Sequence, residues 1–152
     1  MNDLAGMRRG TSDDLKALVA LQHAAYAPNR ALLGVEPIPL QADYAAVLRD
    51  WEVWLLDGTD SLAGALIVEP RADDLLIWSV AANPAAQRGG TGNRMLAAAE
   101  ERAQQLGRKA IRLYTGQALT HNVAWYSRKG YRVESVEQMP DRAIVHMVKT
   151  HF

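Results

Sequence analysis

The stretch NPAAQRGGTGNRMLAAAEE, residues 83–101, does most to restrict the fold of this 152-residue chain. It follows a continuous apolar run at 75–82, which is typical of a buried central strand. It leads into a helix predicted to begin near Gly90 and to close at Gly107. One face of that helix is apolar and consists of Met95, Leu96, Ala99, Ala103 and Leu106. A strand joined through glycines to an amphipathic helix predicts an α/β fold with the helix packed on a sheet.

The glycines of this stretch indicate an anion site. The first N–H groups of a helix have no intrahelical partner and carry a partial positive charge. Glycine at positions 89, 90 and 92 would let a phosphate approach the backbone closely. The spacing is neither the GxxxxGKS/T of a P-loop nor the GxGxxG of a dinucleotide fold. It fits the pattern QxxGxG, with Gln87, Gly90 and Gly92 at the fixed positions.

With this pattern placed after an apolar strand, the sequence resembles the GNAT superfamily of N-acetyltransferases. In that family the loop binds the pyrophosphate of acetyl-coenzyme A through backbone N–H groups. The resemblance implies acetyl-CoA as the acetyl donor, with N–H donors between Arg88 and Asn93. The residues expected to bind it here are Gln87, Arg88, Gly89, Gly90, Thr91, Gly92 and Asn93. Taken alone, QxxGxG also fits a Gly-rich turn that binds nothing.

Two residues of the loop depart from the family's usual pattern. Thr91 stands where an apolar or basic residue is common, and Gly89 adds flexibility beside the phosphate site. These departures affect the expected rigidity of the loop and its affinity for the cofactor more than the identity of the cofactor.

A second segment, HNVAWYSRKGYR, resembles a later motif of the same family, in which an asparagine begins a short helix and a tyrosine follows four residues on. Asn122 and Tyr126 occupy these places, and their spacing puts both side chains on one helix face. Tyr126 is the candidate general acid, because a phenol can protonate a departing thiolate without carrying charge itself. Its alternative role is a core aromatic. Asn122 is expected to orient the pantetheine arm or a water, or simply to begin the helix.

Making an amide from a thioester also requires a donor to the oxyanion and a base for the amine. The resemblance assigns the oxyanion donor to the N–H of Val80, and it pairs Ala82 with the pantetheine arm as if the arm were another strand. Glu69 ends the strand before this one and is the candidate base, acting directly or through a water. A solvated carboxylate at a strand end is the equally balanced alternative.

Three further residues are weaker candidates. His121 is a second candidate base, although a place at the start of a helix favours exposure. Glu36 and Tyr44 lie where the family places its acceptor pocket, and they are named for substrate binding by position alone.

The rest of the chain predicts one domain, residues 1–152, with the element order β-α-α-β-β-β-α-β-α-β-β. By the resemblance, this is an α/β fold of the GNAT type, with a mixed, mostly antiparallel central sheet flanked by helices. Thr11 or Ser12 is expected to cap the first helix, and Thr120 the last. Residues 29–40 are expected to form an ordered loop because prolines and a glycine interrupt them.

The charges balance overall but divide unevenly along the chain. Residues 1–76 hold 6 Lys and Arg against 12 Asp and Glu, whereas residues 77–152 hold 11 against 5. The balance argues against nucleic acid or a membrane surface as a partner. The basic half contains the cofactor motifs, and the acidic half contains much of the acceptor region. This division favours a small-molecule primary amine, cationic in character, as the acetyl acceptor.

Cysteine is absent, which excludes a cysteine acyl-enzyme and thiolate metal sites. Direct attack of the amine in a ternary complex is therefore expected. The histidines lack metal-ligand spacing, so no metal is predicted. No apolar stretch is long enough for a signal peptide or a membrane span, which predicts a cytoplasmic protein.

The functional alternatives are a non-catalytic acyl-CoA sensor or regulatory domain, an acetyltransferase of protein or peptide amines, and a structural α/β domain. An apolar, Trp-bearing edge is also compatible with a homodimer.

Overall fold

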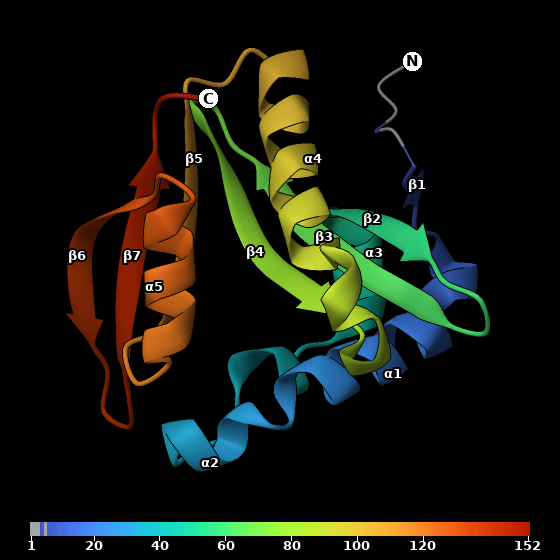
Figure 1. Ribbon diagram of the computed structural model, residues 1–152, viewed down its shortest axis with the longest axis horizontal. Helices are drawn as coiled ribbons and strands as arrows, with labels where there is room; N and C mark the ends of the chain where they lie inside the picture. The colour runs from blue at the N-terminus through green and yellow to red at the C-terminus, as the bar shows by residue number, and fades with distance from the viewer. Residues whose placement is uncertain (1–3, 5) are drawn as a thin grey trace.

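A computed structural model describes residue 4 and residues 6–152, except for the side chains of residues 87–89. Seven strands in this part of the chain form one sheet, in the order β1-β2-β3-β4-β5-β7-β6 (Figure 1). They are β1 (Arg8–Arg9), β2 (Glu52–Asp57), β3 (Leu62–Pro70), β4 (Asp74–Ala82), β5 (Ala110–Gly116), β6 (Arg132–Gln138) and β7 (Ala143–Lys149). Only β4 and β5 pair in parallel. The prediction of a mixed, mostly antiparallel sheet is confirmed.

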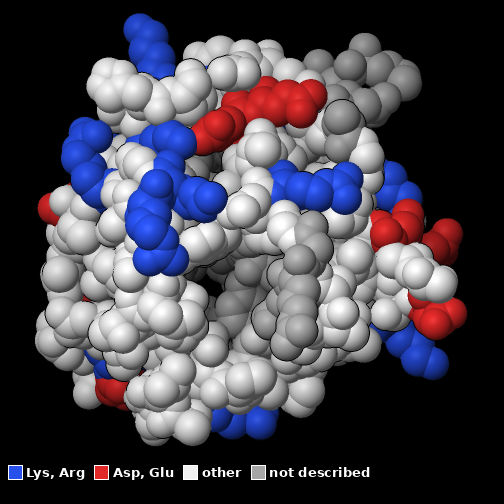
Figure 2. All heavy atoms as spheres, viewed as in Figure 1, with Lys and Arg blue, Asp and Glu red and all other residues white. Residues whose placement is uncertain are grey.

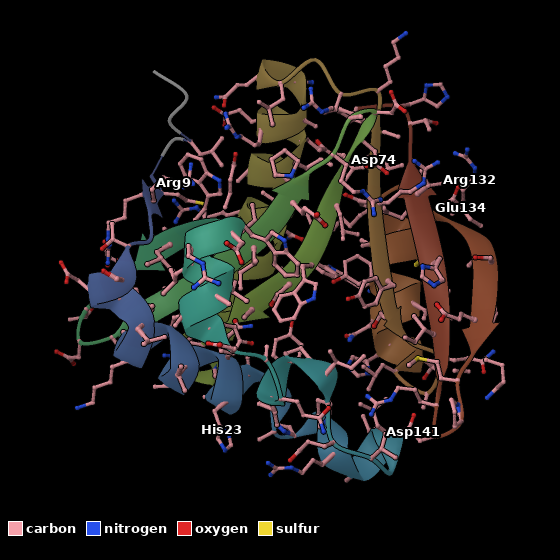
Figure 3. All side chains as sticks on the ribbon, turned by 180° about the vertical axis from the view of Figure 1, so that it is seen from behind. Arg9, His23, Asp74, Arg132, Glu134 and Asp141 are labelled. Carbon is pink, nitrogen blue, oxygen red and sulfur yellow. The ribbon has the colours of Figure 1, made fainter. Side chains whose placement is uncertain are left out.

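Helices cover both faces of the sheet. They are α1 (Leu15–Tyr26), α2 (Asn29–Leu33), α3 (Tyr44–Asp50), α4 (Thr91–Gln105) and α5 (Thr120–Arg128), with 3-10 turns η1 (Ser12–Asp14), η2 (Ile38–Leu40) and η3 (Pro84–Gly89). In Figure 1, α4 and α5 lie in front of the sheet and α1 and α3 lie behind it. The view from behind in Figure 3 brings α1 and α3 to the front.

Two local predictions need correction. Residues 29–40 are not an uninterrupted loop, because they contain α2 and η2. Pro28 has a backbone φ of −60°, which suits the entry to a helix, and Gly34 ends α2 at a φ of 72°. Thr120 is the first residue of α5 rather than its cap. The N-cap is Leu119, which has no side chain able to accept the helix N–H groups.

Each face of the sheet buries its own hydrophobic core. On the α4 side, Met95 and Ala99 are completely buried against strand residues such as Leu66. The apolar helix face predicted from the sequence is therefore the face that packs on the sheet. On the other side, Leu18 of α1 packs in a second cluster with Ile67. The sheet is thus held rigidly between two layers of helices.

An irregularity in β4 changes which side chains face α1. Ile67 of β3 pairs with Ser79, but the next residue, Val68, pairs with Ile77, so Trp78 is an extra residue in the ladder. Trp78 packs against the α1-side core, and Ser79 accepts a hydrogen bond from α1. Two consecutive side chains therefore lie on the same face, as a β-bulge allows.

The only parallel pair of strands separates halfway along. β4 and β5 stay in register from Asp74 opposite Ala110 to Ile77 opposite Leu113. Beyond that point β5 continues to pair with β7, as far as Gly116 opposite Ile144. Residues 78–82 of β4, all described, have no register partner on β5. The sheet consequently has an opening in its middle, between two strands whose other edges are paired.

Ion pairs hold the closed end of this opening and the first strand. Asp74 is nearly buried and accepts hydrogen bonds from Arg71 at 2.7 Å and from Arg112 at 2.9 Å. These guanidinium groups, Arg71 above all, hold the pKa of Asp74 below its usual value. Arg112 extends the network to Glu134 on β6, which Figure 3 shows on the same side of the sheet as Asp74. The network therefore links β4, β5 and β6 where the two parallel strands still pair.

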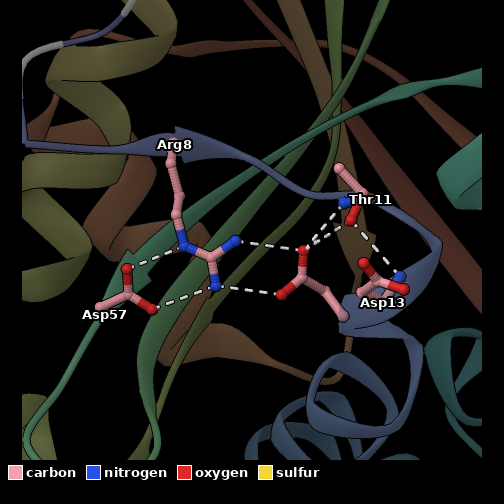
Figure 4. Close-up of polar contacts among 5 residues, drawn as sticks. Arg8, Thr11, Asp13 and Asp57 are labelled. Atoms are coloured by element: carbon pink, nitrogen blue, oxygen red, sulfur yellow. Dashed lines mark hydrogen bonds and ion pairs between the residues drawn. The ribbon is translucent and has the colours of Figure 1, made fainter.

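At the edge of the sheet, Arg8 of β1 bridges two carboxylates. Its guanidinium contacts Asp57 at the end of β2 and Asp14 of η1 (Figure 4). Asp14 also accepts from the Thr11 N–H, and Thr11 accepts from the Asp13 N–H, so the predicted Thr11 cap is present in a reciprocal capping box.

Candidate active site

A cavity of about 160 Å³ lies where β4 and β5 separate. Residues 77–80 of β4 form one wall and residues 113–116 of β5 form another. α5 contributes Asn122, Trp125 and Tyr126, and the side of α1 contributes Tyr26. Figure 2 shows the surface hollowed between α5 and the start of α4, with Lys and Arg side chains gathered beside the hollow. Three of the residues predicted for the site, Val80, Asn122 and Tyr126, thus line one cavity.

The backbone of β4 faces this opening at alternate residues. The Asn83 N–H donates to the Ala63 carbonyl at 2.8 Å, and Ala65 lies opposite Ala81 in the same register. In an antiparallel ladder, bonded and non-bonded pairs alternate. Val80 and Ala82 are therefore non-bonded toward β3, and their N–H and C=O groups point toward the open side. The hydrogen bond of the Tyr26 hydroxyl to the Val80 carbonyl, at 3.3 Å, agrees with this orientation.

A relay of hydrogen bonds from α1 holds the β4 edge. Gln22 Nε2 donates to Ser79 Oγ at 3.0 Å, and Ser79 Oγ lies 2.8 Å from the Tyr26 hydroxyl. Because that hydroxyl donates to Val80, Ser79 is the donor to Tyr26. Burial raises the pKa of Tyr26, so the phenol stays protonated and keeps its donor. The bulge makes the relay available, since it turns Ser79 toward α1.

The first backbone N–H groups of α4 have no acceptor within the helix. The first intrahelical bond runs from the Arg94 N–H to the Gly90 carbonyl, and Gly90 provides no side-chain cap. The N–H groups of Thr91, Gly92 and Asn93 are thus left without a helical acceptor. Gly90 has a φ of 73°, which favours glycine, and a Cβ there would meet nothing within 4 Å. The glycine is therefore required by the backbone turn that exposes these donors.

The three preceding loop residues can be placed only in part. Gln87, Arg88 and Gly89 lie in η3, just before the α4 N-terminus, and their side chains lie outside the described residues. Thr91 is buried, and its hydroxyl donates to the Ala86 carbonyl at 3.2 Å. That bond ties α4 to the turn before it. The departure at Thr91 therefore has a structural use.

Packing explains Gly92, for which the sequence predicted only phosphate access. A Cβ at this position would lie 3.1 Å and 3.2 Å from two ring carbons of Trp125. The absence of a side chain lets the α5 indole lie against the first turn of α4. The two predicted motifs are consequently in direct contact, and Trp125 forms one boundary between the helix N-terminus and the cavity.

Tyr126 and Asn122 both line the cavity from α5. The Tyr126 ring packs edge-on against Tyr131 at 5.9 Å and beside Trp125 at 5.0 Å. Its hydroxyl makes no hydrogen bond to any described residue. Burial strongly raises the pKa of Tyr126 and keeps the phenol neutral. A neutral hydroxyl facing a cavity can donate a proton there, and the ring also serves as a core aromatic.

The other candidates lie outside the residues that line the cavity. Glu69 is partly exposed on β3 opposite Leu76, although its charge acts on Tyr114, which does line the cavity. His121 is exposed. Glu36 is paired with Arg30, which lowers the pKa of the Glu36 carboxyl. The Tyr44 hydroxyl donates to the Pro39 carbonyl at 2.6 Å. Their predicted roles in catalysis and in acceptor binding therefore stay predictions.

Several residues that line the cavity were not named individually from the sequence. They include Tyr26, Asn29, Tyr114 and Arg142, with Pro37–Pro39 along the same wall. Tyr114 lies on β5, and its alternation with buried Leu113 was the one local pattern pointing to an exposed side. Tyr26 and Arg142 carry no such pattern, because contacts between distant parts of the chain place them here.

In the described part of the chain, no helix combines the length and apolar character needed to cross a bilayer. Likewise, no three His, Asp or Glu side chains among these residues are grouped so that they could hold a metal ion.

Comparison with known proteins relates this arrangement to a family. An N-acetyltransferase of Bacillus subtilis strain 168, the uncharacterized YvbK, is 28% identical over 79 residues, 51% of each chain. The amino-acid acetyltransferase of Pseudomonas paraeruginosa is 36% identical over 74 residues, 49% of this chain and 16% of that one. The matches thus span about half of the first relative and a small part of the second.

A solved structure shares the fold over nearly the whole chain. The PaiA N-acetyltransferase of Thermoplasma acidophilum, in complex with coenzyme A, superposes with a TM-score of 0.77 at 16% identity, covering 95% of this chain and 98% of that one. Residues 18–131 match the Acetyltransferase (GNAT) family. This segment contains the opened sheet, the uncapped start of α4 and Tyr126. The chain therefore belongs to the acetyltransferase (GNAT) family.

Proposed function

We propose that this protein is an acetyl-CoA-dependent N-acetyltransferase that transfers the acetyl group directly to a primary amine of a small molecule. The observation that carries the proposal is that three features lie close together, since two belong to the cavity and the third, the start of α4, lies against the cavity residue Trp125. These are the free N–H groups at the start of α4, the unpaired edge of β4 and the Tyr126 hydroxyl. Each supplies a different requirement of the reaction.

The donor fits the first two features. The N–H groups of Thr91, Gly92 and Asn93 would bind the diphosphate, aided by the positive end of the helix dipole. The diphosphate would also be surrounded by the preceding loop, which consists of Gln87, Arg88, Gly89 and Gly90. The Ala82 edge would pair with the amides of the pantetheine arm, and Asn122 would orient it from α5. Basic side chains beside the hollow in Figure 2 supply a favourable field for the phosphates.

The chemistry uses Val80 and Tyr126. The Val80 N–H, on the open edge of β4, would donate to the carbonyl oxygen as negative charge develops during attack by the amine. Tyr126 would protonate the sulfur as the carbon–sulfur bond breaks, which releases neutral CoA thiol. Tyr126 is a neutral phenol at neutral pH, and burial keeps it neutral, so the proton is present for this step. Binding both substrates together avoids any acyl-enzyme.

The amine must lose a proton for the reaction to balance. Because no described residue lining the cavity is Asp, Glu or His, we propose that water carries this proton away from the amine. Glu69 is the proposed final acceptor on the α1 side, where its charge already acts on Tyr114. Changing Glu69 to Gln tests this, and kcat should fall about tenfold or more if it is the base. An unchanged kcat would remove Glu69 from the mechanism.

The experiment that tests the proposed function measures thiol release from acetyl-CoA in the presence of an amine panel. The chain has no cysteine, so a thiol reagent reports only the CoA that is released. Amine-dependent release, with loss in a Tyr126→Phe variant, supports the enzyme. Stabilisation of the fold by CoA without release from any amine would favour the acyl-CoA sensor instead. Release that depends only on peptide or protein amines would contradict the small-molecule acceptor.

A further inference from the structure

The cavity has one charged side chain among the described residues that line it, Arg142. This residue lies in the turn between β6 and β7, and its side chain is only 10% exposed. No Asp or Glu belongs to the same set of lining residues. A guanidinium withdrawn from water needs an anionic or strongly polar partner. The electrostatic character of this wall is therefore opposite to the one needed for a cationic acceptor.

Arg142 is only partly satisfied by its own neighbour. Its Nε and Nη2 atoms lie 3.2 Å and 3.1 Å from the carboxylate oxygens of Asp141, which is 52% exposed. Nη1 donates to no described residue and remains available. Asp141 occupies only Nε and Nη2, so a ligand can share the guanidinium through Nη1 without breaking this pair. Figures 1 and 3 place this turn beside α2, and Leu33 of α2 borders an adjoining hollow with Arg142.

A second feature adds positive potential at the same wall. α5 begins beside Arg142 without a side-chain cap, and its N-cap Leu119 and its third residue Asn122 line the cavity. The N-terminal end of a helix favours a negative group. Asn29 and Tyr114 supply further hydrogen-bonding groups on this wall. Two independent features, a buried guanidinium and a helix N-terminus, thus favour the same charge.

We propose that Arg142 is a specificity-determining residue that binds a carboxylate of the acceptor, which makes the acceptor a small amino-carboxylate. The proposal rests on the proposed function, because it concerns the second substrate of the same cavity. A cavity of about 160 Å³ admits a molecule of this size. The carboxylate at Arg142 would direct the amine toward Val80 and Tyr126. No Asp or Glu of the acidic first half of the sequence is among the described residues that line the cavity, and the candidate Glu36 is paired with Arg30.

The test compares amino acids with their own amides, which keep the amine and lose the carboxylate. Wild-type protein should acetylate at least one amino acid with a kcat/KM about tenfold or more above that of its amide. Arg142→Gln should raise KM for the amino acid by about tenfold to a hundredfold, with kcat within about threefold. The amide should be nearly unaffected by the substitution. Arg142→Lys should recover part of the loss, because it restores charge without the planar fork.

Arg49 provides a matched control. It pairs with adjacent Asp50 at 3.1 Å and 3.2 Å, as Arg142 does with Asp141, but its side chain is 69% exposed and lies outside the cavity lining. Arg49→Gln should leave both substrates unchanged. Asp141→Asn should lower KM for the amino acid, because it removes the competing carboxylate. Equal use of acids and amides by the wild type, or an Arg142→Gln variant that behaves like Arg49→Gln, would overturn the inference.

A binding measurement separates this inference from the proposed function. If CoA binds but no amine is acetylated, calorimetry with N-acetylated amino acids in the presence of CoA decides the matter. Binding that is weakened about tenfold or more by Arg142→Gln would support the carboxylate site although the catalytic proposal had failed. Absence of binding to both proteins would overturn the carboxylate site as well.

Discussion

The Tyr26 hydroxyl donates to the Val80 carbonyl at 3.3 Å, across the open edge of β4. This bond joins the last turn of α1 to Val80, the residue whose N–H is proposed to stabilise the oxyanion. It also shows how the opening is maintained. Where β5 leaves β4, a side chain from α1 takes over part of the bonding that a neighbouring strand would supply.

Tyr26→Phe is expected to lower kcat by up to about tenfold, because the β4 backbone at Val80 loses a hydrogen bond that fixes its orientation. The free energy of unfolding should fall by about 0.5–1.5 kcal/mol. Tyr44→Phe is the comparison, since that hydroxyl donates to Pro39, accepts from Gln22 at the outer end of the same relay and lies outside the cavity lining. It should cost similar stability and lower kcat less than Tyr26→Phe does. Equal loss of kcat in both variants would show a general effect of stability instead of a local one.

Gly90 and Gly107 allow the backbone turn at the start of α4 to be tested against an equivalent turn at its other end. Their φ angles are 73° and 69°, and a Cβ at either would meet nothing within 4 Å. Each substitution by alanine should destabilise the fold by about 1–2 kcal/mol through backbone strain alone. Only Gly90→Ala should weaken CoA binding in calorimetry, because only that turn presents the α4 donors. Equal CoA affinity in the two variants would argue against binding at this turn.

Tyr126→Phe should lower kcat by about one to four decades while leaving the Kd for CoA within about twofold. The raised pKa of Tyr126 means that its proton is retained as pH rises, so kcat should show no loss from this group up to about pH 10. Tyr131→Phe is the control, because that buried hydroxyl has no partner in the described structure and lies outside the cavity lining. Its removal should be neutral or slightly stabilising. The assignment would be contradicted if the kcat of the wild type fell with rising pH already below about pH 9 and Tyr126→Phe removed that fall.

Asp74→Asn should reduce the free energy of unfolding by about 1–3 kcal/mol at pH 7, since Arg71 and Arg112 lose their carboxylate. The folded-state pKa of Asp74 is lowered, so its contribution is complete above the unfolded value of about 4 and is lost as pH falls through the folded pKa. The difference between the two proteins in urea unfolding should therefore shrink from pH 7 to about pH 3. Asp50→Asn, in an exposed pair, should show little effect at either pH. A constant difference across this range would contradict the ionic origin.

Local patterns predicted the elements that a short segment determines by itself. The apolar face of α4 contains Met95 and Ala99, both fully buried, and the glycines at 90 and 107 flank this helix in the left-handed conformation. Three site residues, Val80, Asn122 and Tyr126, line the same cavity. The sequence could name them because the family resemblance assigns them by motif and needs no knowledge of distances. α2 was missed because Pro28 reads as a stop, although its φ also suits the start of another helix.

The remaining features depend on long-range pairing. The opening exists because Trp78 is an extra residue opposite β3 and because β7 pairs with β5 where β4 leaves it. Neither register can be predicted from the periodicity of a single segment. Arg142 reaches the cavity only because the β6–β7 turn folds back beside α2. The charge of the acceptor wall therefore could not be inferred from the charge of a half of the sequence.

The central claim is that the backbone at the start of α4 and along the free edge of β4 holds acetyl-CoA. A crystal structure with bound CoA tests it most directly, through the distances from the diphosphate oxygens to the backbone nitrogens of residues 91–93. We expect at least two of these distances to be about 2.7–3.2 Å, with the pantetheine arm along Val80 and Ala82. A CoA molecule bound elsewhere, or a diphosphate that makes no contact with these nitrogens, would contradict the account.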